Sequence, residues 1–306
     1  MGRIVGPIVA MMVGASCLSR PHDPLIQREL PPRRVLIVRM SHLGDVAQAL
    51  TLVHAIHAAW PNAEIGWAIQ KEFATLVEPF AKVFLFDRRG GLGAWPRIRS
   101  EMRAWQPDIA LDAQGNWKSA VCTRLSGAPR RYGFEKGAWQ EPVAARIAGL
   151  VHVPTPDAPA SLASSPPHLA PLCRSIAAFV TGAAGLTERI DPLLTETEIE
   201  RGRALLTGGL GTQAKEPVTV LHPGVAGDPR TWPAARFEEL GSRLVNRGER
   251  VLFLTGPGEA DTGRALERAV PKAAHLVGQR GLRDLCALLH AVAERDGQIL
   301  VSDSGP

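Results

Sequence analysis

A carboxylate stands where a hydrophobic strand gives way to a helix, and this is the first place in the chain where we expect chemistry. The apolar run 35–38 predicts a strand covered on both faces, and apolar residues at three- and four-residue steps predict a helix over 46–60. Asp45 lies at or just before the first turn of that helix. Its carboxylate either caps free backbone amides or points into the crevice beyond the strand, where open α/β sheets bind ligands.

Further polar side chains follow other predicted strands. Gln114 and Lys118 come after the strand 108–112, at the same crevice edge as Asp45, where polar side chains suit sugar hydroxyls. Lys118 either meets a carboxylate of a bound molecule or is an exposed lysine in the first turn of the next helix. Glu259 follows the strand 251–255. It either binds ribose hydroxyls or is an ordinary residue at a helix N-terminus, favoured there by the helix dipole.

Two glycine-containing loops predict phosphate recognition in the second half of the chain. Gly224 comes directly after the strand 218–222 and leads into a loop that carries Arg230, so backbone amides and a guanidinium group can both face a diphosphate. A second loop of this kind follows the last predicted strand, 298–302. Its residues are Asp303, Ser304 and Gly305.

Strands and helices alternate twice along the chain, which predicts an α/β protein with two Rossmann-like halves. The first half contains strands 35–38, 64–69, 82–86 and 108–112, with helices 46–60, 73–77 and 95–105. The second contains helices 197–206, 235–247, 261–270 and 282–292, with strands 218–222, 251–255, 275–277 and 298–302. Between them, residues 151–171 are rich in Pro, Ala and Ser and predict a connection, followed by a linking helix over 171–182.

A length of 306 residues is enough for two domains of ordinary size. We predict a disordered or mis-started extension over 1–32, one domain over 33–170 and a second over 171–306. The apolar stretch 4–18 is short for a membrane span, which needs about 20 residues, and export is the minority interpretation. The four cysteines lack metal-ligand spacing and fit reduced thiols.

Positive charge is concentrated in the first half. Residues 30–150 hold 16 Lys and Arg against 10 Asp and Glu, whereas residues 151–306 hold 16 against 18. A basic surface attracts phosphorylated lipid or nucleic acid. The alternative interpretation is an ordinary solvent-exposed face without a partner. No helix-turn-helix, zinc-finger or RNP pattern is present, so lipid is favoured over nucleic acid.

Four sequence blocks together resemble glycosyltransferase family 9, the bacterial heptosyltransferases that build the inner core of lipopolysaccharide. They are SHLGDV (41–46), LDAQGNWKSA (111–120), HPGVAGDPRTWP (222–233) and VSDSGP (301–306). They occur in the family's order, and the stretches 112–120 and 132–142 are most similar to its heptosyltransferase I group. A Rossmann oxidoreductase is disfavoured, because residues 40–45 contain one glycine instead of G-x-G-x-x-G.

This resemblance implies a GT-B fold, two Rossmann-like domains facing a cleft, and metal-independent transfer of heptose from ADP-heptose to Kdo of lipid A with inversion. Asp45 would be the general base, and no cofactor is expected. The donor site would contain Gly224, Arg230, Glu259, Asp303, Ser304 and Gly305, and the acceptor site Ser41, Gly44, Gln114 and Lys118. The resemblance also implies a cytoplasmic enzyme, peripheral on the inner face of the inner membrane.

The chain stops at Pro306, before the H-x-A-A continuation that the resemblance implies. From this we expect an incomplete second domain, a last strand without its covering helix on one face, and weak or no activity. The alternative function is therefore a non-catalytic nucleotide-sugar-binding protein of the same fold.

Overall fold

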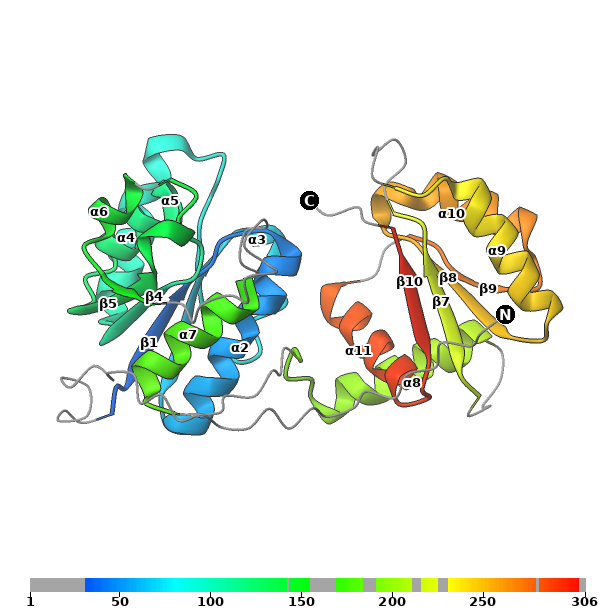
Figure 1. The fold of residues 1–306 in the computed structure, drawn as a ribbon, viewed down its shortest axis with the longest axis horizontal. Coiled ribbons are helices and arrows are strands. Elements are labelled where there is room, and N and C mark those ends of the chain that lie inside the picture. The colour runs from blue at the N-terminus through cyan, green and yellow to red at the C-terminus, as the bar shows by residue number, and fades with distance from the viewer. Residues whose placement is uncertain are drawn as a thin grey trace.

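The computed structural model describes residues 31–141, 143–154, 169–183, 191–210, 216–224, 231–278 and 281–302. Residues 1–30 of the predicted extension therefore lie outside the described residues, as do Arg230, Asp303, Ser304 and Gly305. The described residues form two lobes, each built on its own parallel sheet with helices on its faces (Figure 1). The predicted α/β class is confirmed.

The first lobe has six parallel strands among the described residues, in the order β3-β2-β1-β4-β5-β6. Its elements are β1 (Arg34–Val38), α2 (Leu43–Ala59), β2 (Glu64–Ile69), α3 (Lys71–Ala74), β3 (Lys82–Leu85), α4 (Ala94–Trp105), β4 (Ile109–Asp112), α5 (Trp117–Leu125), β5 (Arg130–Phe134), α6 (Ala144–Ala148), β6 (Val151–Val153) and α7 (Leu169–Thr181). Short 3₁₀ turns occur at Gly91–Gly93 and Lys136–Ala138.

Central strand β1 is buried on both faces, as its continuous apolar run predicts. Val35 and Ile37 enter a core shared with α2 and α7, whereas Leu36 and Val38 enter a core on the other face, shared with α4. Helix α2 begins at Leu43, three residues before the first apolar residue of its repeat. It therefore includes Asp45 in its first turn.

The predicted boundary at residue 170 is wrong, because α7 belongs to the first lobe. Leu172, Ile176 and Val180 are buried in that lobe's core, and the helix packs along α2 and β5. The connection predicted from residue 151 is also wrong at its start, since Val151–Val153 is the edge strand β6. Three residues at a sheet edge are too few to show a strand period in the sequence.

The second lobe has four parallel strands among the described residues, in the order β10-β7-β8-β9. Its elements are α8 (Glu196–Leu210), β7 (Val218–His222), α9 (Ala234–Asn246), β8 (Arg250–Leu254), a 3₁₀ turn at Pro257–Glu259, α10 (Ala260–Ala269), β9 (Ala274–Leu276), α11 (Leu282–Ala293) and β10 (Gln298–Val301). Helices α8 and α11 pack on one face, and α9 and α10 pack on the other.

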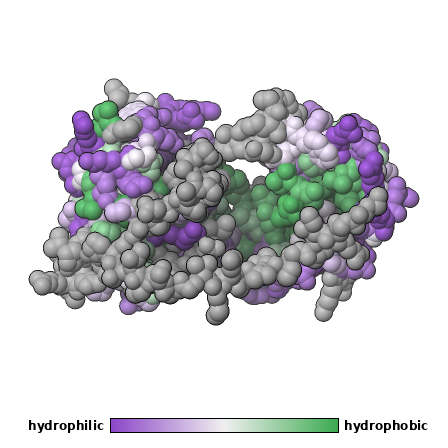
Figure 2. Space-filling view, viewed as in Figure 1, coloured by the Kyte–Doolittle hydropathy of each residue, from purple (hydrophilic) through white to green (hydrophobic). Residues whose placement is uncertain are grey.

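Edge strand β10 has an exposed apolar surface. Ile299, Leu300 and Val301 are 45%, 39% and 61% exposed, and none of the described helices covers them. Figure 2 shows hydrophobic surface where Figure 1 has β10 and β7. Because successive side chains of a strand point to opposite faces, β10 is exposed on both faces in the described part of the chain, where the sequence predicted one uncovered face.

No helix in the described parts of the chain combines the length and apolar character that a bilayer crossing needs.

Close packing of α8 on α11 depends on a glycine, and this gives a stability prediction. A Cβ added at Gly202 would overlap the carbonyl group of Ala287 in α11, so Gly202→Ala must push the two helices apart. We expect it to lower the free energy of unfolding by about 1–3 kcal/mol, the usual cost of overpacking, measured by urea denaturation.

Gly208→Ala is the matched control for Gly202→Ala. It lies on the same helix, and an added Cβ there meets nothing within 4 Å. It should raise the free energy of unfolding by up to about 1 kcal/mol, because alanine favours the helix. Equal effects at the two positions would contradict the packing account.

Candidate active site

Asp45 lies where the carboxyl end of β1 meets α2. It is the third residue of the helix, and its side chain is 36% exposed. Among the described residues its carboxylate has one hydrogen-bond partner, the guanidinium group of Arg39, which contacts Oδ2. The N-cap residue His42 makes no side-chain cap. Asp45 therefore pairs with a cation instead of capping its own helix.

Arg39 is not among the residues predicted from the sequence. It follows β1 directly, its side chain is 5% exposed, and burial lowers the pKa of its guanidinium group despite the nearby Asp45 carboxylate. Its Nη1 donates to the carbonyl oxygen of Ala113, at 2.9 Å. The sequence feature that could have identified Arg39 is its position: it directly follows an apolar strand and lies six residues before an aspartate.

The surface in front of the α2 N-terminus is open. Gly44 is exposed, and a Cβ added to it would meet no atom within 4 Å. Ser41 is half-buried beside it. A partly exposed carboxylate next to open space can reach a hydroxyl group of a bound molecule, and this is the geometry that a general base needs.

The loop after β4 is tied to the loop after β1. Gln114 is buried, and its Oε1 accepts a hydrogen bond from the backbone N–H of Met40 at 2.7 Å. The Asp112 carboxylate accepts the N–H groups of Gln114 and Gly115, both at 3.0 Å. Burial raises the pKa of Asp112, and these hydrogen bonds oppose that effect. Gln114 thus holds two loops together as well as lying at the predicted edge.

Lys118 lies in the first turn of α5, where the structural alternative from the sequence placed it, but it is not the exposed lysine that this alternative predicted. The helix begins with a capping box in which Asn116 accepts the N–H of Ser119 at 3.0 Å. Lys118 is half-buried, and its Nζ lies 5.9 Å from the ring centre of Trp117. It remains at the same sheet edge as Asp45, since α5 follows β4 directly.

The two predicted phosphate loops start side by side in the second lobe. Strands β7 and β10 are paired so that His222 is opposite Val301, and Ser302 donates its N–H to the His222 carbonyl at 3.2 Å. Gly224 has a φ of +79°, a conformation that favours glycine. The chain therefore enters both loops at one edge of the sheet.

Glu259 is 6% exposed and supports its own turn. Its Oε2 accepts the N–H of Gly256 at 2.7 Å and lies 3.7 Å from Nδ1 of His222. Glu259 lies at the N-terminus of α10, as the structural alternative from the sequence predicted, but its contact with Gly256 was not predicted. Among the described residues, no three His, Cys, Asp or Glu side chains come together in the way that a metal site requires.

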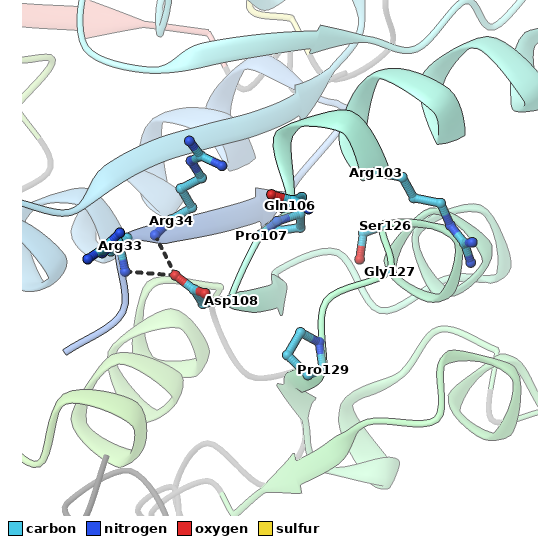
Figure 3. Close-up of a pocket in the computed structure, with 9 residues that line it drawn as sticks. All are labelled: Arg33, Arg34, Arg103, Gln106, Pro107, Asp108, Ser126, Gly127 and Pro129. Carbon is cyan, nitrogen blue, oxygen red and sulfur yellow. Dashed lines mark hydrogen bonds between the residues drawn. The ribbon is translucent and has the colours of Figure 1, made fainter. Parts of the chain in front are cut away.

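A hollow of about 810 Å³ lies at the amino ends of the strands of the first sheet, whereas Asp45 lies at their carboxyl ends. It is lined by the start of β1, the end of α4 and the turn before β5 (Figure 3). Asp108 accepts the N–H groups of Arg33 and Arg34 there, at 2.7 and 2.9 Å. The guanidinium groups of Arg34 and Arg103 donate to the carbonyls of Trp105 and Leu125. These contacts brace the amino ends of the strands.

Sequence comparison matches the second half of the chain to a protein-family model. The glycosyltransferase family 9 (heptosyltransferase) model matches residues 176–306. This part of the chain is therefore similar to glycosyltransferase family 9. Lipopolysaccharide heptosyltransferase 1 of Pseudomonas aeruginosa is 30% identical over 126 residues, which are 37% of this chain and 36% of that enzyme.

The similarity to family 9 glycosyltransferases extends into the first lobe. Lipopolysaccharide heptosyltransferase 1 of Escherichia coli K12 is 26% identical over 247 residues, 76% of this chain and 72% of that enzyme. These homologues indicate that the chain is a glycosyltransferase.

Solved family 9 structures share the two-lobed arrangement. The E. coli heptosyltransferase WaaC with ADP has a TM-score of 0.64 at 20% identity, covering 89% of this chain and 91% of that one. A family 9 glycosyl transferase from Veillonella parvula DSM 2008 has a TM-score of 0.69 at 16% identity, covering 91% and 84%. The predicted GT-B fold is confirmed.

Proposed function

We propose that the chain transfers heptose from ADP-heptose to a Kdo hydroxyl of lipid A, with inversion at the sugar and without a metal or cofactor. The observation that carries this proposal is a half-exposed carboxylate, Asp45, at the carboxyl edge of the first sheet in a chain similar to heptosyltransferases. Lipopolysaccharide heptosyltransferase 1 is the name of the relatives from both P. aeruginosa and E. coli.

In this mechanism Asp45 accepts the proton of the acceptor hydroxyl while the sugar passes through an oxocarbenium-like state. The attacking oxygen forms its bond to the anomeric carbon from the face opposite the departing ADP, which inverts that carbon. Ser41, Gly44 and the amide of Gln114 lie around the acceptor. These three residues share the edge of the sheet that carries Asp45.

The second lobe holds the donor in this proposal. Positive groups and backbone amides that face the diphosphate stabilise the negative charge that develops on ADP as the bond breaks. We assign this role to Gly224, Arg230, Ser304 and Gly305, with Asp303 and Glu259 on donor hydroxyls. Support comes from the paired strands β7 and β10, whose ends lead into both loops, and from similarity to WaaC, which was solved with ADP.

A lipid-linked acceptor places the reaction at a membrane surface, and we assign it to the inner face of the inner membrane. We therefore propose a cytoplasmic protein that contacts this surface peripherally, drawn to anionic lipid by the excess of Lys and Arg in residues 30–150.

The proposed function is tested by incubating the chain with ADP-heptose and Kdo-lipid A and following the product by mass spectrometry. We expect one heptose to be added and ADP to be released. Calorimetry with ADP-heptose, with NADH as the control ligand, separates the alternatives. Donor binding without product would favour the non-catalytic binding protein, and binding of neither the donor nor ADP would contradict both.

Lys118 has two interpretations that kinetics can separate. If Nζ meets the acceptor carboxylate, Lys118→Met should raise the acceptor KM by about tenfold or more, the cost of a charge-assisted hydrogen bond, with an unchanged donor Kd. Lys136→Met, a change at an exposed lysine of the same lobe, is the control. Equal, small effects for both variants would mean that Lys118 is only a solvated helix residue.

A further inference from the structure

Arg39 is held from two sides at the carboxyl end of the first sheet. Its carbonyl accepts a hydrogen bond from Nε1 of Trp67 at 2.9 Å, and Trp67 lies fully buried on the neighbouring strand β2. Its Nη1 donates to the carbonyl of Ala113 beyond β4, on the other side. Backbone and side chain are both fixed by buried neighbours, so the guanidinium group has little freedom to move.

We propose that Arg39 is a positioning residue for the transfer reaction, which holds the Asp45 carboxylate in the orientation from which it accepts the acceptor proton. This inference rests on the proposed function of Asp45. Nη2 of Arg39 contacts Oδ2 of Asp45, and the described residues supply no hydrogen bond to Oδ1. One carboxylate oxygen is therefore anchored, and the other has no partner among the described residues; a Cβ added to the preceding Gly44 would meet nothing within 4 Å.

The chemistry gives this anchor a second effect. When Asp45 takes the acceptor proton, the buried Arg39 loses its neutralising partner, because the side chain of Arg39 remains charged and only 5% exposed. Its Nε is also buried without a hydrogen-bond partner in the described part of the chain. Asp45 therefore also neutralises a buried cation.

A purely structural ion pair would show the same contacts, so the test must measure coupling to Asp45. A double-mutant cycle on kcat, measured at saturating substrates, does this with Asp45→Asn, Arg39→Met and the variant that combines them. Methionine retains much of the arginine stem packing, and the combined variant leaves no buried unpaired charge.

If Arg39 acts through Asp45, Arg39→Met alone should lower kcat by about tenfold or more, but by less than about twofold once Asp45 is already asparagine. The donor Kd should not change. Arg39→Lys should recover part of kcat, since it keeps the charge and loses the planar fork. It also serves as the test if Arg39→Met fails to fold.

Arg131→Met is the matched control. Arg131 is another partly buried arginine of this lobe; it donates to the carbonyls of Ala128 and Gly149, and burial lowers its pKa. If Arg131→Met lowers kcat, its fold-loss and that of Asp45→Asn should multiply in the variant that combines the two changes. If the fold-losses of Arg39→Met and Asp45→Asn also multiply in their combined variant, or if Arg39→Met alone leaves kcat unchanged, the positioning role is overturned. An unchanged kcat in Asp45→Asn would instead overturn the proposed base.

Discussion

Asp45→Asn is expected to lower kcat for heptosyl transfer by about 10²–10⁴-fold, the usual contribution of a general base, while the Kd for ADP-heptose stays the same. The amide has the shape of the carboxylate and can still accept a hydrogen bond from Arg39, but it cannot take up the acceptor proton. The measurements are kcat at saturating substrates and the donor Kd by calorimetry.

Asp87→Asn is the control for this prediction, because Asp87 is an exposed carboxylate that follows strand β3 of the same sheet, which β2 separates from β1. It accepts the N–H of Arg89 and lies outside the proposed site. Its kcat should stay within about twofold of the unaltered chain, as expected of a surface change away from the reacting groups. A similar loss in both variants would mean that general charge, not proton transfer, is being measured.

Arg283→Met is expected to lower the free energy of unfolding by about 3–5 kcal/mol, because it breaks a buried ion pair. Arg283 is 8% exposed, and its guanidinium group bonds both oxygens of Glu198 at 2.8 and 2.5 Å. It also donates to the carbonyls of Pro192 at 2.5 Å and Leu76 at 3.3 Å. Leu76 belongs to the first lobe, so this one side chain joins α11, the connection and both lobes.

Arg203→Met is the matched control, measured by the same urea denaturation. Arg203 also bonds both oxygens of one carboxylate, that of Glu294, at 2.8 and 2.5 Å across α8 and α11. Its side chain is 47% exposed, so the loss should be below about 1 kcal/mol, as for surface ion pairs. Comparable losses for the two variants would show that burial of Arg283 contributes nothing.

The pair of Arg283 and Glu198 also predicts a pH dependence. Hydrogen bonds from Arg283 lower the pKa of Glu198 from 4.5 to about 2. A lowered carboxyl pKa stabilises the folded state above the unfolded pKa, and the stabilisation is lost as the pH falls through the folded value. Denaturation between pH 6 and 2 should therefore show a loss between 4.5 and about 2 that Glu198→Gln removes.

The sequence predicts those helices and strands in which apolar residues recur at a clear period or form a continuous run. Strands β2 and β7 have the predicted bounds because their apolar runs end abruptly in polar or turn residues. Strand β5 was not predicted, since it begins with two arginines and contains a glycine. The apolar stripe of α7 was predicted as a helix, but nothing in its own residues says which lobe it packs on.

The candidate site was predicted in position but not in detail. The rule that loops after parallel strands share one edge brings Asp45 and Gln114 together correctly. What each side chain bonds depends on contacts between residues far apart in the chain, such as Gln114 with Met40. Glu259 illustrates the same limit, because the hydrogen bond that its Oε2 accepts from Gly256 does not follow from its residue type.

The most direct test is a crystal structure of the chain with ADP-2-deoxy-2-fluoro heptose, the donor analogue found in a WaaC structure. We predict ADP bound at the ends of β7 and β10, with the heptose facing Asp45 and room between them for an acceptor hydroxyl. That hydroxyl would lie about 3 Å from the carboxylate, within hydrogen-bond reach. An analogue bound elsewhere, or a heptose turned away from Asp45, would contradict the account.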